Sequence, residues 1–176
     1  MRASAVRPTG AERFFRENEL IVSKTNPKGI ITYANDVFCR MAAATEDELL
    51  GQPHSVIRHP EMPRAVFKLL WDTLGAGSEI FAYVNNLGFD GAHYWVFAHV
   101  TPSRSMTGQL VGYHSNRRAP AKEAVAAVEP LYRKLLQIER DHPSSKDGLA
   151  ASVAALQTTL SEAGMTYDEF VWSVTP

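Results

Sequence analysis

The 176-residue sequence contains one cysteine, Cys39, no surplus of charge of either sign, and no long apolar run. A single cysteine excludes an intramolecular disulfide and a metal site built from several cysteines, and it is compatible with a reducing compartment. Lys and Arg number 18 against 19 Asp and Glu, which leaves no basic surplus to bind nucleic acid. No run approaches the roughly 20 apolar residues that cross a bilayer, and the N-terminus lacks the apolar core of a signal peptide. We therefore expect a soluble, cytoplasmic protein with no nucleic-acid partner and no direct membrane insertion.

Composition and length favour one globular domain with an appendage. Apolar residues make up 45% of the chain and charged residues 21%, as in folded proteins. Changes in pattern divide the chain into an N-terminal cap (1–18), a domain (19–119) and a C-terminal helical extension (120–176). Within the cap, residues 9–18 are predicted to form a short helix anchored by Phe14 and Phe15.

Short runs of β-branched and aromatic residues, separated by turn residues, predict five strands. The clearest run is HYWVFAHVT at 93–101, in which two faces alternate. The Asp90-Gly91 pair before it is a strong hairpin signal. The other strands are expected at residues 20–23, 30–33, 79–85 and 109–116.

Capping residues predict helices between the second and third strands. Asn35 precedes the run VFCRMAA as a favoured N-cap. Thr45 and Glu48 have the spacing of a capping box, and Pro63 is suited to the start of a further helix. The resulting order, β-β-α-α-α-β-β-β, predicts an α+β fold with one five-stranded antiparallel sheet and a helical crossover.

Residues 51–74 concentrate the most chemistry. His54, Arg58 and His59 lie close together in a Pro-containing loop that leads into the predicted helix. A basic loop before an amphipathic helix suits a wall for an anionic or aromatic ligand; a solvated loop before a capped helix is the alternative. The spacing also predicts one buried face on the helix. Its expected members are Val66, Leu69, Leu70 and Trp71.

Five segments occur together in an order and spacing typical of one family. They are YAND at 33–36, ELLGQPH at 48–54, RHPEMP at 58–63, GAHYWV at 91–96 and AVEPLY at 127–132. The sequence resembles the flavin-binding PAS domain of bacterial aerotaxis (energy-taxis) transducers over about residues 20–135. The chain looks similar to a stand-alone soluble PAS protein.

The resemblance implies a PAS fold with FAD held non-covalently between the sheet and the helical side. Arg58 can form two hydrogen bonds to a phosphate or a flavin carbonyl, and both neighbouring histidines can donate or accept. Asn35 offers a donor and an acceptor at the edge of the ring. Aromatic residues, Phe97 among them, can line an apolar, stacking pocket. The implied cofactor-binding residues are Asn35, His54, Arg58, His59, Trp71, Tyr83, Asn86 and Trp95.

Each assignment has a structural alternative. Arg58 can pair with Glu61 or Asp72 on the surface. His59 can cap the helix, and Asn35 is a natural helix cap whatever its role toward a ligand. His93 and His99 share a strand face, which leaves a metal or haem site open.

The sequence also departs from the family pattern at two positions. Ile80 lies close to where many flavin-binding relatives carry a tryptophan, which puts the identity of the cofactor in question. Glu61 stands where aspartate is usual, a conservative change.

Three functions follow from these residues. The first is a redox- or oxygen-responsive PAS sensor that binds FAD and relays its redox state to a chemotaxis (aerotaxis) partner, a chemoreceptor or other signalling protein. The alternatives are a haem-binding PAS gas sensor and a cofactor-free PAS interaction module. No nucleophile elbow, phosphate-binding glycine loop or convergent carboxylate pair occurs, so we expect no enzymatic activity.

Two amphipathic helices are predicted after the domain, at 124–140 and 146–163, followed by a capped turn at Thr166 and Glu169. Pro130 is expected to kink or restart the first helix. The pair should form a hairpin that folds back on the domain or forms a homodimer surface. A truncation after Ala119 is expected to leave a folded, flavin-binding core that no longer associates with itself or its receptor.

Overall fold

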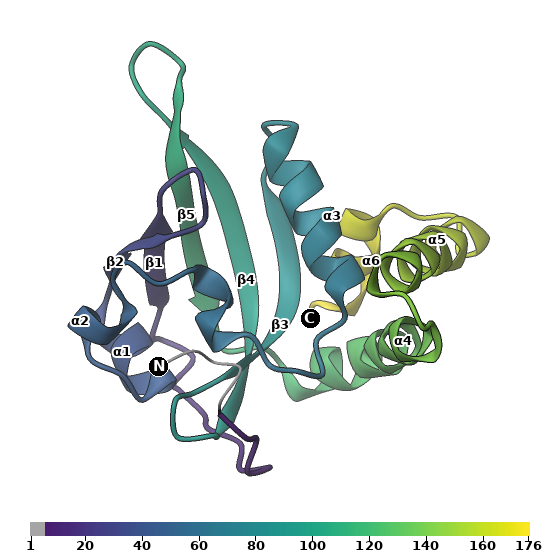
Figure 1. Cartoon of the computed structure of the whole chain (residues 1–176), viewed down its shortest axis with the longest axis horizontal. Coiled ribbons are helices and arrows are strands. Elements are labelled where there is room, and N and C mark those ends of the chain that lie inside the picture. Colours follow the sequence, from purple (N-terminus) through teal and green to yellow (C-terminus); the bar gives the residue numbers. More distant parts are fainter. Residues whose placement is uncertain (1–5) are drawn as a thin grey trace.

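The computed structural model describes residues 6–176 and contains one five-stranded sheet with helices on both faces (Figure 1). The helices α1 and α2 lie at the β1–β2 end, and α4, α5 and α6 gather at the β3 end beside α3. No helix in the described part is long and apolar enough to cross a membrane. In chain order the elements are β1 (Ile21–Thr25), β2 (Ile31–Ala34), α1 (Asp36–Ala42), α2 (Glu46–Leu49), a 3₁₀ turn η2 (His54–Ile57), α3 (Arg64–Gly75), β3 (Ile80–Leu87), β4 (His93–Arg104), β5 (Leu110–Arg118), α4 (Lys122–Asp141), α5 (Ser145–Glu162) and α6 (Tyr167–Val174).

The strand order is β2-β1-β5-β4-β3, and every neighbouring pair is antiparallel, which confirms the predicted sheet. The first strand is thus internal, paired with β2 on one side and with the last strand on the other. β4 continues through Pro102, which was predicted to lie in a loop. Pro102 pairs with Tyr113 of β5 but lies beyond Val100, where the pairing with β3 ends. A proline is tolerated there because β4 has a neighbour on one side only.

The predicted caps are confirmed. Asn35 accepts from the backbone N–H of Phe38 at the start of α1, and Thr45 with Glu48 forms a reciprocal capping box on α2. Thr166 and Glu169 do the same on α6. These caps form because each side-chain oxygen binds backbone donors that the first helical turn leaves unpaired.

The predicted helix at residues 9–18 is wrong. This segment is extended and lies beside the start of β4, where Arg13 donates from its backbone to the carbonyl of His93 and His93 donates to the carbonyl of Ala11. Phe14 is exposed instead of anchoring a helix. Gly10, at φ 78°, interrupts helical geometry, and the pairing with β4 satisfies the backbone instead.

The buried face of α3 is rotated relative to the prediction. Val66, Leu70 and Leu74 are buried, four residues apart, whereas Leu69 is only partly buried. Trp71 is 39% exposed, at the margin of the sheet rather than under it. The sequence did not distinguish the two faces because apolar residues occur on both.

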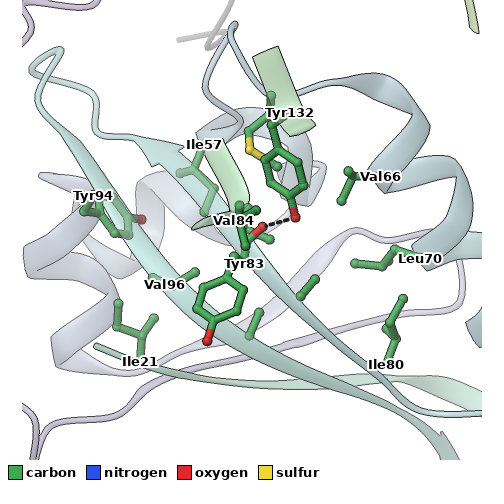
Figure 2. Close-up of a cluster of buried hydrophobic side chains, with 14 of the residues drawn as sticks. Ile21, Ile57, Val66, Leu70, Ile80, Tyr83, Val84, Tyr94, Val96 and Tyr132 are labelled. Carbon is green, nitrogen blue, oxygen red and sulfur yellow. Dashed lines mark hydrogen bonds between the residues drawn. The ribbon is translucent and has the colours of Figure 1, made fainter. Parts of the chain in front are cut away.

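The C-terminal helices belong to the same hydrophobic cluster as the sheet. Val128, Tyr132 and Leu135 of α4 are buried in that cluster, and the Tyr132 hydroxyl donates to the backbone carbonyl of Tyr83 on β3 at 2.8 Å (Figure 2). The helices α4 and α5 form the predicted hairpin, which packs against α3. Pro130 neither ends nor restarts α4; it is exposed, so water can bind the backbone carbonyl that its ring leaves free.

Candidate functional site

A cavity of about 90 Å³ lies between α3 and the inner face of the sheet. The strands supply residues at a spacing of two, because alternate side chains point to the same face. The other walls come from η2, the loop after it, and α3. The lining residues are Ser23, Thr25, His54, Ser55, Arg58, Phe67, Leu70, Trp71, Leu74, Val84, Asn86, Val96, Ala98, Val100, Tyr113, Ser115 and Arg117.

One end of the cavity is polar and is built around Arg117 of β5. This residue is 2% exposed, and its guanidinium lies over the ring of Phe38 at 4.3 Å. Its Nη2 donates to the hydroxyl of Ser23 at 2.5 Å, and that hydroxyl lies 3.1 Å from Nε2 of His54. Burial lowers the pKa of Arg117 to about 10, so the side chain is still charged at neutral pH.

His54 is held in the neutral state. Its ring stacks on Phe38, and burial, followed by the nearby charge of Arg117, lowers its pKa to about 3. The residue as a whole is half-buried, but its ring is enclosed between Phe38 and Ser23. A neutral imidazole keeps one acceptor and one donor nitrogen, so His54 can assist hydrogen bonding without adding a second charge here.

Arg58 and Asn86 form a second polar group across the cavity. Their backbones form an isolated antiparallel bridge, and the guanidinium of Arg58 lies 3.7 Å from the centre of the Phe67 ring. Burial lowers the pKa of Arg58. Stacking on Phe67 keeps the guanidinium plane in place without using its hydrogen-bond donors.

Several buried polar atoms on the cavity wall have no hydrogen-bond partner among residues 6–176. They are Oγ1 of Thr25, Nε of Arg58, Nδ2 of Asn86, and Nε and Nη1 of Arg117. Buried polar groups in folded proteins are nearly always paired, because an unpaired one costs about 1–3 kcal/mol. Four of the five atoms are donors, and no carboxylate lines the cavity, so the wall is suited to a ligand rich in hydrogen-bond acceptors.

The rest of the cavity is apolar, and Trp71 lies at its margin. The indole packs edge-on to Tyr113 at 5.3 Å and lies against the turn at Gly29, where an added Cβ would be 3.2 Å from the ring. Leu70 and Leu74 of α3 face Val84 and Ala98 of the sheet. An apolar slot with polar groups at its ends is the form of site that holds a planar heteroaromatic ring.

Four of the eight predicted site residues share this cavity: His54, Arg58, Trp71 and Asn86. Asn35 does not line it. Its Oδ1 accepts from the backbones of Val22 and Phe38 at 3.0 Å each, and its Nδ2 donates to the carbonyl of Leu20 at 2.8 Å. Asn35 therefore joins β1 to α1.

His59, Tyr83 and Trp95 also lie outside the cavity. His59 is buried and accepts from the backbone N–H of Glu61. Tyr83 and Trp95 belong to the opposite face of the sheet, where Tyr83 bonds Thr175 at 2.7 Å and Trp95 packs on Tyr132. Both side chains contact the C-terminal helical segment, so they do not line this cavity.

The sequence reasoning missed the contribution of β5. The predicted strand ended at residue 116, yet Arg117 belongs to β5 and is one of the largest fully buried side chains. A signal was present, since Tyr113, Ser115 and Arg117 alternate with His114 and Asn116 and so share one strand face. Arginine is seldom fully buried, so its residue type did not mark Arg117 as part of a cavity wall.

In chemistry, the donors and the apolar side chains on the cavity wall suit the ring of a flavin, whose carbonyl and imine groups are acceptors. The volume is smaller than the roughly 300–1,000 Å³ of small-molecule sites, so a flavin would enter only if the cavity wall moved outward.

Comparison with known proteins identifies the fold family. The family model for the PAS fold matches residues 31–117. Over 119 residues the chain is 41% identical to the aerotaxis receptor of Escherichia coli (strain K12), an alignment that covers 68% of this chain and 23% of the receptor. It is 30% identical over 97 residues to the nitrogen fixation regulatory protein of Klebsiella pneumoniae, covering 55% and 20%. The chain thus spans about a quarter or less of these relatives' length.

Solved structures agree on the fold. A light-oxygen-voltage domain studied with a flavin analogue has a TM-score of 0.56 at 20% identity, covering 63% of this chain and 83% of that one. The PAS domain of a Colwellia psychrerythraea protein has a TM-score of 0.54 at 17% identity, covering 58% and 87%. The five-stranded sheet, the cavity beneath α3 and these matches lead to one conclusion: through residues 31–117, the chain belongs to the PAS fold family.

Proposed function

We propose that this protein binds a flavin, FAD, non-covalently in the cavity and acts as a redox- or oxygen-responsive sensor for a chemotaxis signalling partner. The observation that carries the proposal is the set of unpaired donors on Arg58, Asn86 and Arg117 around an apolar slot. Such donors are stabilised by a ligand that supplies acceptors. The identity to the aerotaxis receptor supports the signalling class.

The chain's own residues would hold the ring and exclude water. Leu70, Leu74 and Val96 would contact its apolar body, and Arg58 and Asn86 would donate hydrogen bonds to its acceptors. A bound flavin supplies reversible electron transfer, which changes the hydrogen-bonding pattern and the charge of its ring. The surrounding polar groups then experience a different partner in each redox state.

A route from the cavity to the C-terminal helices passes through Glu139 of α4. Its carboxylate accepts from the backbone N–H groups of Arg64 and Ala65 at 3.0 Å each and from Nε of Arg64 at 3.0 Å. Pro63 offers no side-chain cap, so Glu139 caps α3 from another element. A shift of α3 when the ligand is reduced would therefore displace Glu139 and with it the hairpin of α4 and α5. We propose that this hairpin contacts the signalling partner.

The first experiment is an absorbance spectrum of the purified protein before and after dithionite. Two broad bands in the blue and near ultraviolet that bleach on reduction indicate flavin, and mass spectrometry of the heat-released cofactor separates FAD from FMN. A sharp Soret band would favour the haem-binding alternative. A colourless protein that binds neither FAD nor FMN on reconstitution rules out the proposal and favours an interaction module.

The second experiment tests the assigned contact. Arg58→Ala removes a charge-assisted hydrogen bond worth about 1.5–3 kcal/mol, which corresponds to roughly a ten- to hundredfold loss of FAD affinity. Arg118→Ala, an exposed arginine at the end of β5, is the matched control. Unchanged flavin occupancy in Arg58→Ala, with an intact circular dichroism spectrum, contradicts the assignment.

A further inference from the structure

Arg117 is a buried cation with no acidic partner. The ion pairs between Lys or Arg and carboxylates within residues 6–176 involve neither Arg117 nor Arg58. Within residues 6–176, its only side-chain hydrogen bond goes to the neutral hydroxyl of Ser23, while Nε and Nη1 have no partner. Buried charges in proteins are ordinarily paired, because removing an ion from water is expensive.

The surroundings of Arg117 do not compensate for its charge. Phe38 on α1 offers only the face of its ring, and Ser23 on β1 offers one oxygen. His54 is kept neutral by the same environment. On the remaining side the guanidinium faces the cavity, whose wall carries a second arginine, Arg58, and no carboxylate. A ligand that supplies hydrogen-bond acceptors would give Nε and Nη1 of Arg117 the partners that they lack among residues 6–176.

We infer that Arg117 determines the specificity of the cavity for a ligand with a negatively charged or carbonyl-rich edge, and that it binds the more negative state of that ligand more tightly. The inference rests on the proposed function for its probe, a flavin. Two-electron reduction of a flavin ring with uptake of one proton adds one negative charge to it. Arg117 then favours the reduced ring and raises its midpoint potential, because it supplies a fixed positive charge in a site shielded from water.

The same observation makes a prediction for the protein without ligand. An arginine that lacks a partner destabilises the ligand-free fold, and replacing buried ions by apolar residues of similar size is often neutral or stabilising. Arg117→Met keeps an unbranched, flexible side chain, shorter than that of arginine, and removes the charge. Ser23 retains His54 as a hydrogen-bond partner in this variant. Affinity for the ligand and stability without it should therefore change in opposite directions.

The test compares Arg117→Met, Arg117→Lys and the control Arg118→Gln. Melting temperatures are measured on flavin-free protein, dissociation constants by titration with oxidised FAD, and midpoint potentials by dithionite titration of the loaded protein. We expect Arg117→Met to melt about 2–4 °C higher without ligand and to bind FAD at least about tenfold more weakly. Its midpoint potential should fall by about 30 mV for each tenfold loss of preference for the reduced ring. Arg117→Lys should lie between Arg117→Met and wild type.

The melting temperatures, affinities and potentials distinguish a ligand-binding role of Arg117 from a structural one. If Arg117→Met melts lower without ligand while its affinity and potential match wild type, Arg117 is a structural residue and the inference is overturned. If the wild type binds no flavin, the proposed function fails, and the ligand-free melting temperatures still decide whether Arg117 lacks a partner: a rise supports the inference and a fall refutes it. If Arg117→Met does not fold, Arg117→Lys gives the same comparison, because lysine keeps the charge but lacks the planar guanidinium. A dissociation constant and midpoint potential equal to those of the wild type in Arg117→Lys would refute recognition by the guanidinium.

Discussion

Replacing Glu139 tests the connection between the cavity wall and the C-terminal helices. Its side chain is 5% exposed and accepts three hydrogen bonds, two of them from backbone N–H groups in the first turn of α3. Glu139→Ala leaves both N–H groups without an acceptor in a buried position. Loss of a helix cap costs about 0.5–2 kcal/mol, and a hydrogen bond to a charged group is worth about 1.5–3 kcal/mol.

The contribution of Arg64 is smaller, because its side chain is about a third exposed and solvent screens the ion pair to below about 1 kcal/mol. These terms predict a loss of about 3 kcal/mol in the free energy of unfolding for Glu139→Ala. Glu139→Gln keeps one acceptor oxygen, but its amide NH₂ would face an N–H group at the start of α3. The free energy of unfolding should therefore fall by about 1–2 kcal/mol.

Urea denaturation gives the free energies, and hydrogen exchange gives the location. In both variants the amides at the start of α3 should exchange faster than those of the central strands. Glu129→Ala, earlier on α4, is the control, since Glu129 makes no ion pair or side-chain hydrogen bond in the part of the chain that the structure describes. A change within about 0.5 kcal/mol of that control would falsify the cap assignment.

Three further outcomes are expected. The pKa of His54 is lowered from 6.5 to about 3, so between these values the unfolded state binds more protons than the folded state. Stability should therefore fall as the pH drops below about 6.5, by at most about 1.4 kcal/mol per pH unit from this group. Urea denaturation at pH 7.5 and at pH 5 should show a smaller fall in His54→Gln than in the wild type. Asn35→Asp loses the hydrogen bond to the carbonyl of Leu20 and should destabilise the fold by about 1–2 kcal/mol. The absorbance spectrum of a bound flavin should not shift. A spectral shift without destabilisation would show that Asn35 contacts the flavin. Tyr132→Phe leaves the buried carbonyl of Tyr83 without its donor and should cost about 1–2 kcal/mol by urea denaturation; an unchanged midpoint would mean that water replaces the hydroxyl.

Local signals in the sequence were enough to predict the fold, because turns, caps and strand alternation act over a few residues. Asn35, Thr45 and Pro63 each begin a helix as predicted. The extended segment at residues 9–18 was not predictable in this way, since its hydrogen bonds go to β4, far away in the sequence.

The site was predictable only in part, for the same reason. His54 and Arg58 follow from a local motif, whereas Arg117 meets Ser23 from 94 residues away. The sequence did not show which face Trp95 occupies, because both faces of β4 carry aromatic or apolar side chains, and α4 covers the face that holds Trp95.

The expectation that a truncation after Ala119 leaves a folded core must be revised. Val128, Tyr132 and Leu135 are part of the same buried cluster as the sheet, and α3 would lose Glu139. We now expect the truncated chain to expose Tyr83 and to unfold or aggregate, so substitutions in the full chain are the better test of signalling.

Because β1 lies between β2 and β5 in the sheet, its position affects the order in which the protein folds during synthesis. β1 pairs with β2 immediately, but a hairpin of two short strands is marginal in water. Its second neighbour, β5, is synthesised only after the other strands, and this closure over a long sequence separation slows folding. Ser23 on β1 meets Arg117 on β5 in that same step. The polar end of the cavity therefore exists only in molecules whose sheet is complete, so a ligand held there would be captured by finished domains and not by nascent ones.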